Sequence, residues 1–73
     1  MYSFKLEKFE GPLDLLLNLI EEEKFNISEI SLSHVTDDFL QYIETHPQIS
    51  PEELADFLVV ATKLLLLKSK LLV

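Results

Sequence analysis

Helix-breaking residues are scarce in this 73-residue chain and stand in only three places. One glycine and three prolines are found, at Gly11-Pro12, Pro47 and Pro51, with long uninterrupted segments between them. Proline lacks the amide proton of a helix interior and clashes with the preceding turn, so each position favours a boundary between elements. The spacing predicts a small, mostly α domain of three helices with a long C-terminal helix.

The first segment divides into an arm and a helix. Apolar and polar residues alternate from Tyr2 to Glu7, which predicts an extended or strand-like arm over residues 1–11. A helix is expected over residues 12–24, with proline at its first position. Leu15 and Leu19 widen its apolar stripe. The residues predicted to form its buried face are Leu13, Leu16, Leu17 and Ile20.

The second helix is expected over residues 32–44, after an irregular link. Ser31 or Ser33 is predicted as its N-cap, because a serine hydroxyl can accept from a free amide of the first turn. Pro47 ends the helix, since the residue before a proline disfavours helical conformation. The residues predicted to join the core from this helix are Val35 and Phe39.

The third helix has the clearest start signal. Ser50, Pro51 and Glu53 combine an N-cap serine, a proline at the first position and a glutamate three residues after the cap. No helix breaker follows, so the helix is expected over residues 51–73 and is the longest of the three. Because no stop signal occurs, we expect it to continue in a longer natural chain.

This third helix carries more apolar surface than a small core needs. At about 100° per residue its main apolar residues fill an arc of about 180°, against roughly 100° for an ordinary surface helix. The predicted core residues here are Leu58, Ala61 and Leu65. We interpret the surplus as a partner-binding surface; alternatively, the arm and the link cover it. The residues predicted to form the partner face are Phe57, Val60, Leu64, Leu67 and Leu71, and an alternative stripe is Val59, Leu66 and Val73.

The charge distribution argues against nucleic acid as a partner. The net charge is −7, and residues 21–56 hold ten acids and one base, whereas residues 57–73 hold three lysines and no acid. Phosphate binding needs clustered cations, so no direct DNA binding by this segment is expected. The start lacks a basic region followed by an apolar one, and the longest apolar stretch, of 11 residues, is too short to span a membrane. The sequence therefore predicts a cytoplasmic protein that does not enter a membrane.

No arrangement of side chains predicts catalysis, a cofactor or a metal site. His34 and Asp38 have helical i, i+4 spacing, but without a third ligand a solvated pair is the simpler interpretation. His46 is interpreted as structural, and the acids at residues 21–23 point in different directions from a helix. The chain has no cysteine, and its one glycine excludes a phosphate-binding loop.

One run of residues resembles a known family. Residues 9–17, Phe-Glu-Gly-Pro-Leu-Asp-Leu-Leu-Leu, resemble the N-terminal signature of the ScpA family, the bacterial kleisins of the SMC condensin complex. Residues 27–30 and 35–36, then residues 55–61, agree in order and spacing with later segments of the family. The likeness covers nearly the whole chain.

The resemblance implies a structural role in chromosome condensation, partition and segregation. In this family the N-terminal domain binds the SMC neck, the coiled coil beside the ATPase head, and helps to close a ring around DNA. The family's ScpB-binding segment and C-terminal winged helix are not found here, so any ScpB contact would use downstream regions. The implied location is the cytoplasm, at the nucleoid. A self-associating helical module remains the alternative, in which the third helix pairs with its copy.

Overall fold

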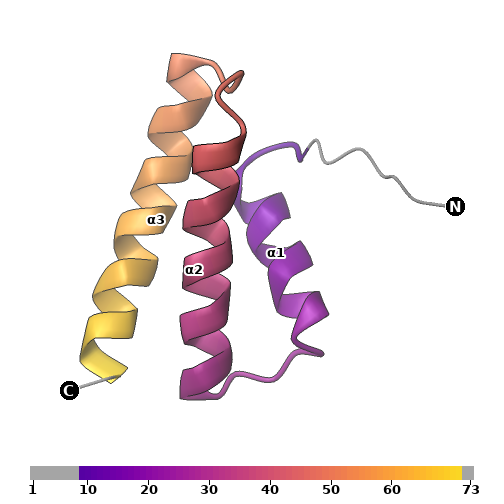
Figure 1. Cartoon of the computed structure of the whole chain (residues 1–73), viewed down its shortest axis with the longest axis vertical. Coiled ribbons are helices and arrows are strands. Elements are labelled where there is room, and N and C mark those ends of the chain that lie inside the picture. The colour runs from indigo at the N-terminus through magenta and orange to yellow at the C-terminus, as the bar shows by residue number, and fades with distance from the viewer. Residues whose placement is uncertain (1–8, 72–73) are drawn as a thin grey trace, which may run out of the picture.

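A computed structural model describes residues 9–71 of the chain. It contains three helices, α1 (Pro12–Glu22), α2 (Glu29–Thr45) and α3 (Pro51–Leu71). α2 lies between α1 and α3 and runs antiparallel to both (Figure 1). The described residues form no strand, so the predicted mostly α domain of three helices is confirmed. The strand-like arm predicted before Phe9 lies outside the described residues.

Both ends of α1 depend on backbone conformations with positive φ. Gly11 has φ 134° at the N-cap, and Pro12 follows at the first helical position. At the other end Lys24 has φ 57°. The amide of Lys24 donates to the carbonyl of Glu21 at 2.9 Å, and that of Phe25 to the carbonyl of Ile20 at 3.0 Å. This pair of bonds is a Schellman motif, so α1 ends sharply at Glu22, two residues before the predicted end.

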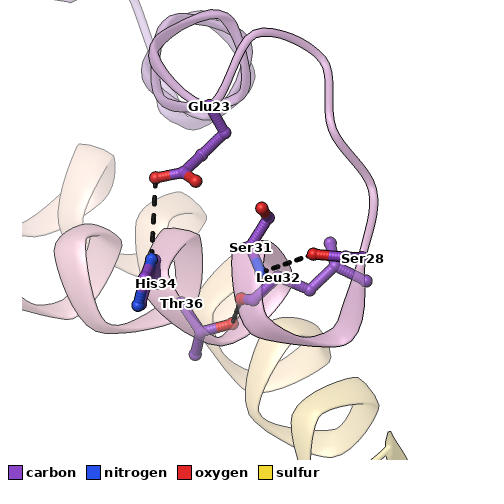
Figure 2. A network of polar contacts seen from close by, with 6 residues as sticks. All are labelled: Glu23, Ser28, Ser31, Leu32, His34 and Thr36. Atoms are coloured by element: carbon purple, nitrogen blue, oxygen red, sulfur yellow. Dashed lines mark hydrogen bonds and ion pairs between the residues drawn. The ribbon is translucent and has the colours of Figure 1, made fainter.

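α2 begins three residues earlier than predicted. Ser28 is the N-cap, and its hydroxyl accepts a hydrogen bond from the amide of Ser31 at 3.1 Å (Figure 2). Ser31, one of the two predicted caps, is instead buried inside the helix. Capping at Ser28 adds a turn, because the amide of Leu32 then bonds the carbonyl of Ser28 at 2.9 Å. α2 ends at Thr45, just before Pro47, for the reason given above.

α3 starts where the capping box predicts. The hydroxyl of Ser50 accepts from the amide of Glu53 at 3.2 Å, which satisfies one free donor of the first turn. The helix then continues without a break to Leu71. Residues 72 and 73, which the prediction included, lie outside the described residues.

One buried apolar cluster holds the three helices together. Each helix contributes two or three side chains to it: Leu15 and Leu19, Val35 and Phe39, and Phe57, Ala61 and Leu64. Phe39 is completely buried, and its ring centroid lies 6.0 Å from that of Phe57. Burial of one such side chain stabilises a fold by about 1.5–3 kcal/mol, so this cluster dominates the packing.

An aromatic group extends the core toward the start of α1. The ring of Tyr42 stacks on His46, with centroids 3.9 Å apart, and its edge contacts Phe9 at 5.5 Å. His46 Nδ1 lies 2.8 Å from the carbonyl oxygen of Tyr42 and can donate a hydrogen bond to it. His46 is therefore a structural residue, as interpreted from the sequence, and Phe9 is held against α2.

α1 is rotated relative to the prediction. Leu15 and Leu19 are buried, whereas Leu13 and Leu17, both predicted in the core, are 69% and 51% exposed. Apolar residues occupy more than half of the circumference of this helix, so periodicity alone did not determine which of them face α2. Two predicted core residues of α1 are partly buried against the cluster: Leu16 and Ile20.

Candidate partner-binding face of the third helix

The inner side of α3 is set by the core. Phe57, Ala61 and Leu64 are buried, and their spacing of four and three residues places them on one stripe of the helix. Val60 packs partly against the same cluster. The side of α3 turned away from this stripe therefore lies at the surface of the domain.

That outer side is apolar and uncharged. Val59 and Leu66 are 55% and 57% exposed, and Leu58 and Leu65 are 46% and 45% exposed. Between and beside them lie small exposed residues. We call this set the outer face; its members are Ala55, Leu58, Val59, Thr62, Leu65, Leu66 and Ser69. Its centre lies about 140° around the helix from the core stripe, at 3.6 residues per turn.

Both hydroxyl groups of the outer face are already hydrogen bonded within α3. Thr62 Oγ1 donates to the carbonyl of Leu58 at 2.8 Å, and Ser69 Oγ donates to the carbonyl of Leu66 at 2.7 Å. A polar group that keeps a hydrogen bond is far less costly to remove from water than one that loses it. Thr62 and Ser69 therefore do not interrupt the outer face as a surface for apolar packing.

An ion pair helps to set the orientation of α3. Lys68 Nζ lies 2.8 Å from Asp37 Oδ1 on α2. The remaining charged side chains of this part of the helix flank the outer face rather than enter it: Asp56, Lys63 and Lys70. The outer face is thus an apolar strip with a charged rim on one side.

The structure places two of the five predicted partner-face residues in the core. Phe57 and Leu64 are buried, so they are not available on the surface of the isolated domain, as a partner face would require. Val60 and Leu71 are partly buried, and Leu67 is exposed. In the alternative stripe, by contrast, Val59 and Leu66 are exposed. Val73 lies outside the described residues.

Two predicted core residues of α3 belong instead to the outer face. Leu58 and Leu65 are exposed, while Ala61 is buried as predicted. The prediction divided the apolar arc of α3 at the wrong place, because apolar residues fill so wide an arc that periodicity alone does not determine which of them face α2. The sequence does offer one signal for the outer face: hydroxyls in helices commonly bond the preceding turn, so Thr62 and Ser69 can lie within an apolar surface.

His34 pairs with a different acid from the one predicted. Its Nδ1 lies 3.9 Å from Glu23 Oε2, across the junction of α1 and α2 (Figure 2), and the described residues show no ion pair between His34 and Asp38. Within residues 9–71 no group of three or more His, Asp or Glu side chains is arranged to hold a metal ion. None of the described helices is both long enough and apolar enough to cross a membrane.

A second set of exposed apolar side chains lies on α1, the link that follows it and the start of α2. Its members are Leu13, Leu17, Phe25, Ile27 and Ile30. Unlike the outer face, this set is spread over two helices and a link, and it has no regular spacing.

Comparisons with known proteins agree with one another. A family model described as segregation and condensation protein ScpA matches residues 19–73. Proteins named segregation and condensation protein A from Halothermothrix orenii and Bacillus cytotoxicus are each 44% identical, over 96% and 97% of the chain. A protein of that name from Bacillus cereus is 42% identical over 97% of the chain. The chain spans 29% of the length of these relatives. No solved structure matches significantly.

Proposed function

This chain belongs to the segregation and condensation protein ScpA family, and from that premise we propose that its domain binds the neck coiled coil of an SMC protein through the outer face of α3. The domain would act as the N-terminal, non-enzymatic part of a kleisin and help to close the SMC–kleisin ring. Such a role belongs to the cytoplasm, at the nucleoid, in chromosome condensation and segregation.

The observation that carries this proposal is the outer face itself. Its seven residues are all exposed, and none is charged. They extend along about 21 Å of helix, at 1.5 Å per residue. A contiguous exposed apolar patch on a small soluble domain is often functional and commonly marks a protein-binding site.

The spacing of the outer face suits a coiled-coil partner. Ala55, Val59, Thr62, Leu66 and Ser69 follow one another at alternating intervals of four and three residues. This is the interval at which side chains of one helix fit between those of another. Because the outer face points away from the core, a neck helix could pack on it without displacing α1 or α2.

Charge favours protein over DNA as the partner of this domain. The chain has a net charge of −7, and ten of its acids lie within residues 21–56. Duplex DNA would be repelled by this charge, whereas the uncharged outer face meets no such penalty with an apolar seam. Contacts with ScpB, if made, would use parts of a longer protein beyond these residues.

The proposal can be tested with Val59→Glu and Leu66→Glu. Each places a carboxylate within the outer face, where binding would strip it of water. Both variants should keep the circular dichroism spectrum of the wild type and lose binding to an SMC neck fragment in titration calorimetry. Gln41→Glu, which adds the same charge at an exposed position of α2, is the matched control and should bind normally.

Two results would argue against this assignment. If Val59→Glu and Leu66→Glu both bind the neck like the wild type, the partner does not use the outer face. If Gln41→Glu loses neck binding to the same degree, the loss comes from the added negative charge rather than from a contact at the outer face. Binding through the predicted face around Phe57 and Leu64 would require the core to open first, since both are buried.

A further inference from the structure

We propose that the outer face of α3 also pairs antiparallel with the outer face of a second copy of this chain, about a two-fold axis passing Thr62. The outer face has the same spacing in both directions from this residue. Ala55 and Ser69 lie seven positions away on either side, and Leu58 and Leu66 lie four positions away. Val59 and Leu65 complete the pattern at three positions.

This symmetry makes the outer face complementary to itself. In an antiparallel pair centred on Thr62, Leu58 of one copy lies opposite Leu66 of the other, and Val59 lies opposite Leu65. The small residues Ala55 and Ser69 meet at both ends, where they allow the helices to approach closely. A two-fold interface requires such self-complementarity, because one patch must serve both partners.

The charged rim favours the antiparallel orientation over the parallel one. Asp56 lies near the start of the outer face and Lys70 near its end. An antiparallel two-fold pair puts both charged rims on the same side and brings Asp56 of each copy toward Lys70 of the other. A parallel two-fold pair puts the two rims on opposite sides of the interface, where these opposite charges do not meet. α3 carries three acids and three lysines, so the excess negative charge of the chain lies on other segments. Lys63 lies beside the axis and meets its own copy, which weakens the pair.

The expected dimer is weak. The outer face measures about 21 Å along the helix by about 10 Å across, well below the ~800 Å² per partner of a standard stable interface. The pairing should therefore depend on protein concentration. If the proposed function holds, an SMC neck would displace the second copy, because both use the same face. This competition depends on the proposed function, whereas the pairing itself does not.

Cysteine crosslinking tests the pairing and its register. The chain has no cysteine, so each introduced thiol is the only one present. Under mild oxidation Thr62→Cys should form covalent dimers several-fold faster than Gln41→Cys, an exposed control on α2. A mixture of Leu58→Cys and Leu66→Cys should crosslink faster than either variant alone, because these residues face each other only in the antiparallel arrangement.

Two outcomes overturn the proposal. Equal crosslinking of Thr62→Cys and Gln41→Cys means that the outer faces do not pair. Rapid crosslinking of Leu58→Cys with itself, matching that of Thr62→Cys, means that the pairing is parallel. No SMC protein is present in these crosslinking experiments. A negative result would therefore overturn the pairing but not the proposed neck binding, which is tested separately by titration.

Discussion

Lys68 Nζ and Asp37 Oδ1 lie 2.8 Å apart, although the two residues are 31 positions apart in the chain. The contact joins the later turns of α3 to α2. The buried stripe that includes Phe57 and Leu64 fixes which side of α3 faces α2, and the ion pair agrees with this orientation. The outer face is thus exposed as a consequence of how the core packs, before any partner is present.

The contribution of this ion pair should be small and sensitive to salt. Asp37→Asn is expected to lower the free energy of unfolding by about 0.2–1 kcal/mol, the range measured for exposed pairs. The loss should shrink at 1 M salt, where exposed charges are screened. Urea unfolding at low and high salt measures the loss of stability and its dependence on salt.

Asp38→Asn is the control, because it removes a neighbouring exposed acid that has no ion pair in the described residues. It should leave the free energy of unfolding unchanged. An equal loss in Asp38→Asn would show that the effect comes from the change in net charge rather than from the ion pair.

The end of α1 offers a stabilising substitution. Lys24 occupies the left-handed position of the Schellman motif, with φ 57°, where a side chain costs about 1–2 kcal/mol relative to glycine. Lys24→Gly should raise the free energy of unfolding by about 1 kcal/mol after the added freedom of the unfolded chain is subtracted. Thermal melting should show a rise of about 4–8 °C. Lys24→Ala removes the same charge but keeps the strain, so it should show no comparable gain.

Gly11 should be required for the turn that leads into α1. Its φ of 134° is rare for other residues, yet no atom lies within 4 Å of the position that a Cβ would take. Gly11→Ala is therefore expected to cost about 1–3 kcal/mol through backbone strain alone. This turn leads from Phe9, which contacts Tyr42, into α1. In a Phe9→Ala background the cost of Gly11→Ala should fall, because the chain no longer has to hold the contact with Tyr42. Urea unfolding of the two single variants and the double variant measures this. If the two losses of unfolding free energy simply add, the turn and the contact are not linked.

The number and order of the helices could be predicted because helix-breaking and capping residues clearly mark the helix boundaries. Gly11-Pro12, Pro47 and Pro51 separate the helices, and Ser50 caps α3 as its capping box indicates. The start of α2 was less certain, since serines at 28, 31 and 33 can all act as caps. The choice of Ser28 adds backbone hydrogen bonds to the helix, an advantage that local sequence rules do not measure.

The rotation of the helices could not be predicted from periodicity. Leucines occupy such wide arcs of α1 and α3 that several rotations would bury a similar amount of apolar surface. The observed choice follows from packing on α2, where Phe39 contacts Phe57 and leaves Leu58 outside. The candidate site therefore depended on tertiary contacts, and the face proposed from sequence includes two buried residues.

The two sides of α3 should respond in opposite ways to the same substitution. Leu64 is 9% exposed and belongs to the core, so Leu64→Glu would bury a carboxylate without a partner, a cost large enough to unfold a domain of 5–15 kcal/mol stability. Leu66, two positions later, is exposed on the outer face, and Leu66→Glu should leave the domain folded. Circular dichroism and thermal melting of both variants compare the two sides directly. Loss of helical signal in Leu64→Glu alone supports the rotation of α3 described above. A folded Leu64→Glu together with an unfolded Leu66→Glu would mean that α3 turns its other side to the core.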